Sequence, residues 1–126
     1  MSQDTKTALR HFSYYKTGGG CRYFFAPTSE EELQRDLALI ARDGLSLFIL
    51  GGGTNSLVMD EFWDGAVLSL HALKRLERVQ NRITVLAGVD NSDFATYAKE
   101  TGLKGAEWMY GLPGQIGGSV RMNARC

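Results

Sequence analysis

The chain has 126 residues, a hydrophobic fraction of 44%, and 14 basic side chains against 14 acidic ones. This size and composition fit one ordinary globular domain, or two small lobes that share a core. The balanced charge argues against nucleic acid or an anionic membrane surface as a partner, since both are bound through an excess of Lys and Arg. No apolar run approaches the roughly 20 residues that span a bilayer, and the N-terminus is polar, so we expect a cytoplasmic protein.

Three strands are predicted in the first half of the chain, at residues 21–26, 45–50 and 65–70. The first is aromatic, and the other two are short apolar runs typical of buried strands. A helix between the first two strands makes a βαβ unit, which places those strands parallel in an α/β fold. Cys21 and Cys126 are expected to be reduced thiols, and neither neighbours a His that would indicate a metal site.

The helix of this unit is predicted from its start signals and its apolar spacing. Thr28 with Glu31, and Ser29 with Glu32, form two overlapping capping boxes directly after Pro27. Apolar residues then recur at helical spacing, which predicts one buried face. The residues expected on that face are Leu33, Leu37, Ile40 and Ala41.

Three consecutive glycines, residues 51–53, follow the second predicted strand directly. Without Cβ atoms in the way, their backbone N–H groups can point into one concavity, and an anion can approach the main chain. Thr54, Asn55 and Ser56 add side-chain donors suited to a phosphate or a sugar hydroxyl. The stretch predicts a ligand-binding loop at the carboxyl edge of the sheet, with a plain tight turn as the alternative.

Two common nucleotide motifs do not fit this loop. A P-loop closes with Lys followed by Ser or Thr, whereas residues 55–57 read Asn-Ser-Leu. A Rossmann fingerprint requires a third glycine where Ser56 stands and then a helix, whereas residues 58–65 are too short and turn-like for one. Any phosphate here is therefore expected to be held by loop amides.

A hairpin and a second helix are predicted next. Residues 76–80 and 83–87 have the composition of strands, and Asn81-Arg82 would form the turn between them. Residues 91–93 offer caps for an amphipathic helix that Gly102 ends.

The last glycine cluster lies in residues 111–118, after Trp108 and Tyr110. Gly accounts for 15 of the 126 residues, well above the usual ~7%, and it is clustered rather than spread. A turn followed by a helix start lined with Gly and Ser is a second anion-binding place, so we expect a diphosphate between two lobes. The two aromatic residues are expected in the core rather than beside a planar ring.

Six segments in a fixed order make a more specific pattern than any one glycine loop. They are Thr-Gly-Gly at 17–19, Pro-Thr-Ser-Glu-Glu at 27–31, the loop at 51–57, Gly-Leu-Pro-Gly at 111–114, Ile-Gly-Gly at 116–118 and Met-Asn-Ala at 122–124. In this order, from about residue 15 onward, the chain resembles the UDP-N-acetylenolpyruvoylglucosamine reductase (MurB) family of bacterial peptidoglycan synthesis.

The resemblance implies an FAD-binding α/β (α+β) fold of the vanillyl-alcohol oxidase (PCMH) type, in which two small lobes clasp the flavin nucleotide. Residues 1–72 would form the first lobe, and residues 73–126 an incomplete second lobe before the substrate domain. The first loop would hold the FAD pyrophosphate, and the last glycine cluster would lie toward the isoalloxazine. The implied FAD-binding residues are Gly51, Gly52, Gly53, Thr54, Asn55, Ser56, Leu57, Gly111, Pro113, Gly114, Ile116, Gly117 and Gly118.

The family's activity is implied only for a longer protein. In the family, NADPH reduces the flavin, and a hydride passes to the enolpyruvyl double bond of a UDP-sugar, giving UDP-N-acetylmuramate. Arg125-Cys126 stand where the family has a glycine followed by a tyrosine-glycine step, and its catalytic arginine, serine and glutamate lie further on. We therefore expect no catalytic residue in this chain, no activity from it alone, and possible self-association through exposed edges.

Two alternatives stay open. Beside a part of the reductase, they are a stand-alone FAD- or nucleotide-binding module without reductase activity, and a part of another oxidoreductase of the same flavin superfamily. The Met-Asn-Ala segment at 122–124 favours the reductase family over the latter.

Overall fold

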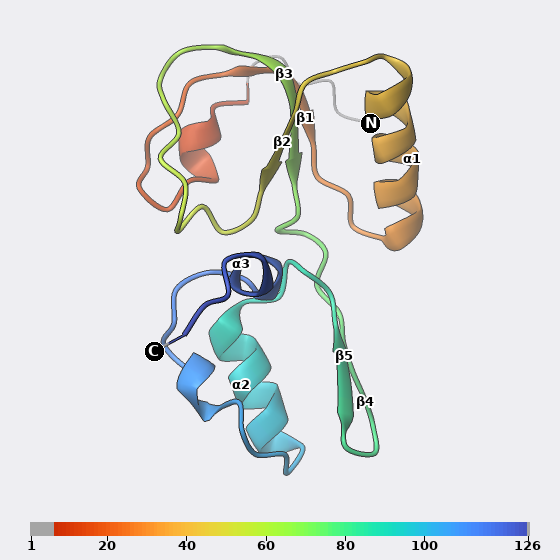
Figure 1. The fold of residues 1–126 in the computed structure, drawn as a ribbon, viewed down its shortest axis with the longest axis vertical. Helices are drawn as coiled ribbons and strands as arrows, with labels where there is room; N and C mark the ends of the chain where they lie inside the picture. Colours follow the sequence, from red (N-terminus) through yellow and green to blue (C-terminus); the bar gives the residue numbers. More distant parts are fainter. Residues whose placement is uncertain (1–6, 126) are drawn as a thin grey trace.

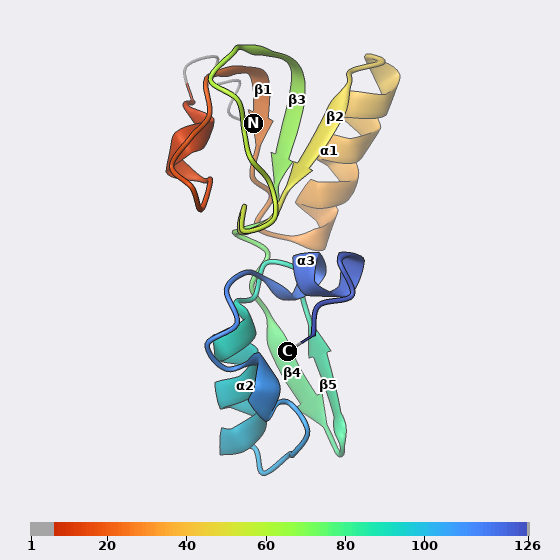
Figure 2. The same ribbon diagram turned by 60° about the vertical axis from the view of Figure 1, so that its left-hand side comes forward.

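The structure, a computed structural model, describes residues 7–125 and shows two parts, each built on its own sheet (Figure 1). A parallel sheet with α1 forms one part, and a hairpin with α2 and α3 forms the other (Figure 2). This arrangement confirms the α/β class, whereas the division at residue 72 stays a prediction. None of the described helices is long and apolar enough to cross a membrane. The elements are η1 (Leu9–His11), β1 (Cys21–Phe25), α1 (Glu30–Arg42), β2 (Leu47–Leu50), β3 (Trp63–Ser69), β4 (Leu76–Val79), β5 (Arg82–Val85), α2 (Asn91–Glu100), η2 (Glu107–Met109) and α3 (Ile116–Arg121).

The three-stranded sheet is parallel throughout, and β3 lies at its centre. Phe24 of β1 and Phe48 of β2 flank Val67 of β3. The strands of the predicted βαβ unit are thus parallel as expected, but they are not adjacent. β3 takes the central place because it is buried on both faces over residues 65–69.

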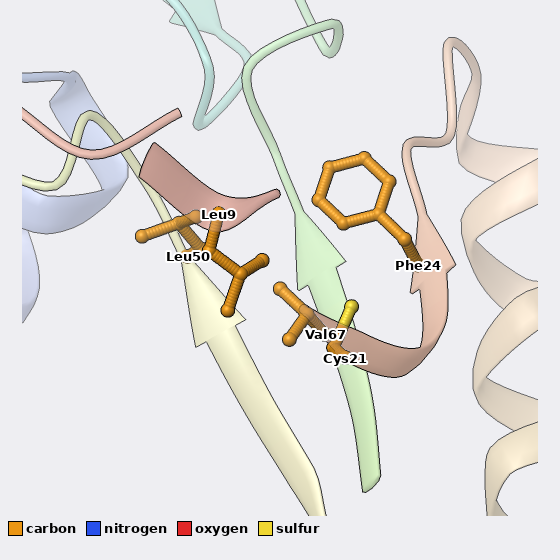
Figure 3. Packing of buried hydrophobic residues seen from close by; sticks show 5 residues of the cluster. All are labelled: Leu9, Cys21, Phe24, Leu50 and Val67. Carbon is orange, nitrogen blue, oxygen red and sulfur yellow. The ribbon is translucent and has the colours of Figure 1, made fainter. Parts of the chain in front are cut away.

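Successive side chains of β3 point to opposite faces and supply two separate cores. The core on the η1 side is drawn in Figure 3, and α1 covers the other. Burying an aliphatic or aromatic side chain contributes about 1.5–3 kcal/mol, so both faces anchor the strand. Cys21 is buried here, while Cys126 lies outside the described residues. The first core contains Leu9, Cys21, Phe24, Leu50 and Val67, and the second contains Phe25, Ile40, Ala66 and Leu68.

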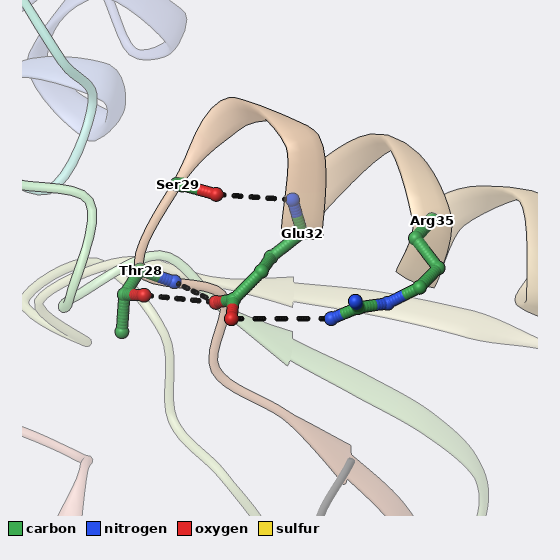
Figure 4. A network of polar contacts seen from close by, with 4 residues as sticks. All are labelled: Thr28, Ser29, Glu32 and Arg35. Atoms are coloured by element: carbon green, nitrogen blue, oxygen red, sulfur yellow. Dashed lines mark hydrogen bonds and ion pairs between the residues drawn. The ribbon is translucent and has the colours of Figure 1, made fainter.

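The start of α1 is capped partly as the sequence predicts (Figure 4). Ser29 Oγ accepts a hydrogen bond from the Glu32 N–H at 3.2 Å. This bond confirms one of the two hydrogen bonds of the predicted capping box between Ser29 and Glu32. The Glu32 carboxylate reaches back to Thr28, accepting from its N–H and its hydroxyl at 2.8 Å each. The predicted pairing of Thr28 with Glu31 is wrong, because Glu32 occupies both Thr28 donors. These hydrogen bonds, that from the Thr28 backbone first, lower the pKa of Glu32.

The buried face of α1 is rotated from the predicted one. Ile40 is buried and Leu33 packs against the sheet, but Leu37 is 39% exposed and Ala41 is also exposed. Asp36 takes an inward position at 7% exposed, and burial raises the pKa of its carboxyl. The spacing of apolar residues predicts the buried face of a helix only to within about one residue. Packing against the sheet decides which residues lie at the middle of that face.

The predicted hairpin is confirmed, with its turn one residue earlier than expected. β4 and β5 pair antiparallel, and Arg82 pairs with Val79 within the ladder. Gln80 and Asn81 therefore form the turn, with Gln80 in the left-handed region at φ +54.

The second part has its own apolar core between the hairpin, α2 and α3. Ala95, Met109 and Ile116 are buried there. The prediction that Trp108 and Tyr110 are core residues is wrong, since they are 44% and 71% exposed. Met109 between them is buried in this core instead.

Candidate functional site

The arrowheads of β2 and β3 point toward the α3 region (Figures 1 and 2). A cavity of about 750 Å³ is lined by residues that follow these strands and by residues of the α3 region. Pockets for small ligands typically span about 300–1,000 Å³, and open α/β sheets bind ligands beyond the carboxyl ends of their strands. Both glycine segments line this cavity. Its lining residues are Ile49, Gly51, Gly52, Gly53, Thr54, Asn55, Ser56, Leu70, Ala87, Leu112, Pro113, Gly114, Gln115, Gly117, Gly118, Ser119, Arg121, Met122 and Ala124.

The first wall of the cavity, residues 51–56, begins with unused backbone donors. Within residues 7–125, the N–H groups of residues 51–53 have no hydrogen-bond partner. Gly53 has φ +69, and a Cβ there would lie 2.9 Å from Tyr14 N. Tyr15 Oη donates to Thr54 O at 3.3 Å, so the loop is held against the segment before β1. Amide donors without an acceptor, on the wall of a cavity, fit an anionic group such as phosphate.

The second wall, residues 111–119, packs closely against the first at glycines of both walls. A Cβ on Gly52 would lie 3.3 Å from Gly114 Cα. A Cβ on Gly114, which has φ +111, would lie 2.9 Å from Thr54 Oγ1. The two walls therefore form a cradle of bare backbone that a side chain at either glycine would fill.

Asn91 of α2 fastens this second wall. Its side chain is fully buried, Nδ2 donates to Leu112 O at 3.4 Å, and Oδ1 accepts from Ser119 Oγ at 3.0 Å. Its backbone N–H donates to Gly114 O at 3.1 Å. The predicted capping role of residues 91–93 is wrong, because Asp90 is the N-cap residue without a side-chain cap bond. The Asn91 side chain is turned toward the second wall instead.

The start of α3 offers fewer donors than the sequence predicts. The Gly117 N–H donates to Ala87 O, and the Ser119 N–H donates to Gln115 O, both at 2.9 Å. A Cβ on Gly117 would lie 2.7 Å from Ala87 Cβ, so this glycine serves close packing. The second wall therefore contributes shape more than charge.

Arg121 is the sole charged side chain among the described residues that line the cavity. Together with the unused amides of the first wall, its guanidinium gives the cavity a positive character. No carboxylate of residues 7–125 opposes it from the lining. The groups whose pKa is displaced by hydrogen bonding or burial lie elsewhere: Glu31, Glu32, Asp36, Arg42, Asp43 and Glu107.

Residues 21–126, which include both walls, match the family described as FAD binding domain. The chain belongs to this family. FAD is the cofactor that the match and the relatives below indicate. The cradle fits such a group, because a diphosphate needs backbone donors at close approach and the first wall supplies them.

Named relatives of this FAD binding domain confirm the predicted resemblance. The UDP-N-acetylenolpyruvoylglucosamine reductase of Treponema denticola is 37% identical, over 94% of this chain and 38% of its own length. That of Trichlorobacter lovleyi is 39% identical, over 91% of this chain and 38% of its own length. The crystal structure of the reductase (MurB) from Thermus caldophilus has a TM-score of 0.74 at 27% identity, covering 95% of this chain and 42% of that one. The chain thus spans about two fifths of these relatives.

Most of the residues predicted to bind FAD come together in the cavity, and three do not. Leu57 is 75% exposed beyond the end of the first wall. Gly111 is exposed, and its N–H donates to Ser92 Oγ at 2.9 Å. Ile116 is a core residue at 9% exposed.

Other lining residues of the FAD binding domain were not predicted as binding residues. Leu70 ends a predicted strand, so its place at the carboxyl edge of the sheet could have been predicted from the sequence. Arg121 follows Gly117 at i+4 on one helix, so its place on the same helix face could also have been predicted. Gln115 carried none, because its role depends on the contact between the two walls. The lining residues not predicted are Ile49, Leu70, Ala87, Leu112, Gln115, Ser119, Arg121, Met122 and Ala124.

Proposed function

We propose that the cavity binds FAD, with the diphosphate on the first wall and the flavin side toward the second. The observation that carries the proposal is the bare cradle in which the amides of residues 51–53 have no partner within residues 7–125. The proposed contacts are Gly51, Gly52, Gly53, Thr54, Asn55, Ser56, Pro113, Gly114, Gly117 and Gly118, with Arg121 as a cation near the phosphates. Bound FAD supplies hydride transfer, and the residues of this chain bind and orient it.

The larger function proposed is that of the FAD-binding part of an NADPH-dependent reductase, converting UDP-N-acetylenolpyruvoylglucosamine to UDP-N-acetylmuramate in peptidoglycan synthesis. The names and identities of the relatives support it. Cytoplasmic location, a UDP-sugar as the small-molecule partner, and no nucleic-acid or membrane partner belong to the same proposal. The relatives extend well beyond the matched region, so the chain by itself is proposed to bind the cofactor without completing the reaction.

A stand-alone FAD-binding module is the second candidate. No described residue of the lining is an Asp, Glu, His, Cys, Lys or Tyr that would donate or accept a proton, as both candidates expect of this chain. Under this proposal the chain supplies a site and no chemistry. Self-association through the two-stranded sheet β4–β5 is proposed for either candidate, since an isolated hairpin with Val79 72% exposed leaves strand edges open.

The absorbance spectrum of the purified chain tests FAD binding. The chain is mixed with FAD, desalted and scanned, with Gly52→Val treated identically as a control. We expect flavin bands that remain with the wild type and are lost with the variant, because a side chain at Gly52 fills the cradle. A colourless wild-type protein after loading would contradict the proposal.

The reductase and the module are separated by the coding sequence after the Cys126 codon and by activity. An open frame whose longer product oxidises NADPH in the presence of the UDP-sugar supports the reductase. An in-frame stop at that point, with FAD retained by the chain, supports the module.

A further inference from the structure

Gln115 places a buried hydrogen-bond acceptor at the junction of the two walls. Its side chain is 6% exposed, and within residues 7–125 its Oε1 has no hydrogen-bond partner. A Cβ on Gly51 would lie 3.6 Å from this oxygen, and a Cβ on Gly52 would lie 3.6 Å from Gln115 Cγ. The carboxamide therefore belongs to the second wall but lies against the glycines of the first, on the lining of the cavity.

Backbone hydrogen bonds fix the position of the main chain around Gln115. Gln115 O accepts from the Ser119 N–H, and the Ile116 N–H donates to Val89 O, both at 2.9 Å. Gln115 also pairs with Asp90 in an antiparallel bridge. A buried acceptor without a donor is costly, and proteins retain few of them. Because Gln115 is one of the residues that line the cavity, its unpartnered acceptor fits a donor brought by a ligand.

The hydrogen-bonding groups of the two walls indicate which ligand group can donate to Gln115 Oε1. The amides of residues 51–53 are donors that suit phosphate oxygens. A phosphate oxygen cannot satisfy Oε1, because both are acceptors at neutral pH. A sugar hydroxyl can donate to Oε1, and in a nucleotide or flavin nucleotide such hydroxyls lie a few bonds from the phosphate. The adjacent donor and acceptor surfaces thus match a phosphate joined to a sugar chain.

We propose that Gln115 Oε1 accepts a hydrogen bond from a sugar-chain hydroxyl next to the ligand's diphosphate, so that Gln115 selects sugar phosphates over bare phosphates. The inference rests on the proposed binding of FAD in this cavity. FAD offers such hydroxyls on its ribityl chain and on its ribose, and FMN and ADP each carry one of the two. Neither hydroxyl is present in pyrophosphate.

Calorimetric titration of the 126-residue chain with FAD, FMN, ADP and pyrophosphate tests the inference. The variant is Gln115→Met, which keeps the length of the side chain and removes the acceptor. Gln34→Met on the exposed side of α1 is the matched control, and thermal melts check that both variants fold. We expect Gln115→Met to weaken FAD binding about tenfold, the usual effect of one lost hydrogen bond to a buried group. Binding of FMN, ADP or both should weaken similarly, while pyrophosphate binding stays unchanged.

The other outcomes overturn the inference in distinguishable ways. Unchanged FAD affinity in Gln115→Met shows that Oε1 contacts no ligand hydroxyl. An equal loss for pyrophosphate shows that the carboxamide contacts phosphate instead, through its NH₂. If the wild type binds pyrophosphate but not FAD, or binds none of the four probes, the proposed function itself fails and the inference fails with it.

Discussion

The two walls of the cavity are built by different means. The first is the end of a buried strand: Leu50 is in the core, the next three residues have no side chains, and their amides have no hydrogen-bond partner within residues 7–125. The second is a loop and a short helix whose amides are partly bonded within the protein and which depend on Asn91. The first wall therefore supplies backbone charge complementarity, and the second supplies shape through side-chain hydrogen bonds. We therefore expect different kinds of substitution to impair the two walls.

The first wall should be the more sensitive to an added side chain. Gly52→Val should weaken FAD binding more than about 100-fold, because the new atoms would press against Gly114 and Gln115 and displace the two walls of the proposed diphosphate site. Gly118→Ala should weaken it less than about tenfold, since a Cβ there meets no atom of the described residues within 4 Å. Flavin fluorescence titration measures both, and Gly20→Ala, outside the cavity, serves as the control. Equal losses at Gly52 and Gly118 would erase the distinction between the walls.

The second wall should be the more sensitive to loss of a polar side chain. Asn91→Ala removes a fully buried amide and leaves the Ser119 hydroxyl and Leu112 carbonyl without it. We expect a loss of about 2–3 kcal/mol in the free energy of unfolding, measured by urea denaturation. FAD affinity should fall as well, because the second wall loses the hydrogen bonds of the Asn91 side chain. Ser119→Ala, which removes one bond only, should cost about 1 kcal/mol. Stability unchanged in Asn91→Ala would contradict this account of the wall.

The two walls also differ in how much of their structure can be predicted from the sequence. The strand that ends at Leu50 and the glycines after it are local features, so the sequence predicts a loop at residues 51–56, and these residues line the cavity. The second wall depends on which distant groups meet. Asn91 was interpreted as a helix cap, Gln115 gave no signal, and Ile116 was assigned to the site although it packs in the core. The face of α1 was misplaced for the same reason, since the sheet and not the helix decides which stripe is buried.

Arg121 should contribute long-range charge rather than shape. Arg121→Gln should weaken FAD binding about three- to tenfold in dilute buffer, and the difference should shrink in 1 M salt because exposed charges are screened. Fluorescence titrations at both salt concentrations measure the effect. Arg35→Gln on α1, exposed and outside the cavity, is the matched control. A loss of equal size at both salt concentrations would indicate a contact other than a screened charge.

The smallest effect is expected in the first part of the fold, away from both walls. Burial raises the pKa of Asp36, so its charged form destabilises the folded state at pH values above that pKa. Asp36→Asn should raise the melting temperature by about 2–4 °C at pH 7. The gain should fade as the pH drops through the raised pKa toward the ordinary value of 3.8, where the wild-type carboxyl also becomes neutral. A gain that persists unchanged at low pH would show that burial of the charge is not its cause. FAD affinity should stay the same.

The most direct test is the change in backbone amide chemical shifts when FAD is added to the ¹⁵N-labelled chain. We expect the largest changes at residues 51–53, smaller changes at residues 114–118, and little change in β4 and β5. Large shifts confined to another surface, such as the smaller cavity between α2 and η2, would contradict it. No shifts at saturating FAD would also contradict the claim that the bare cradle is the cofactor site.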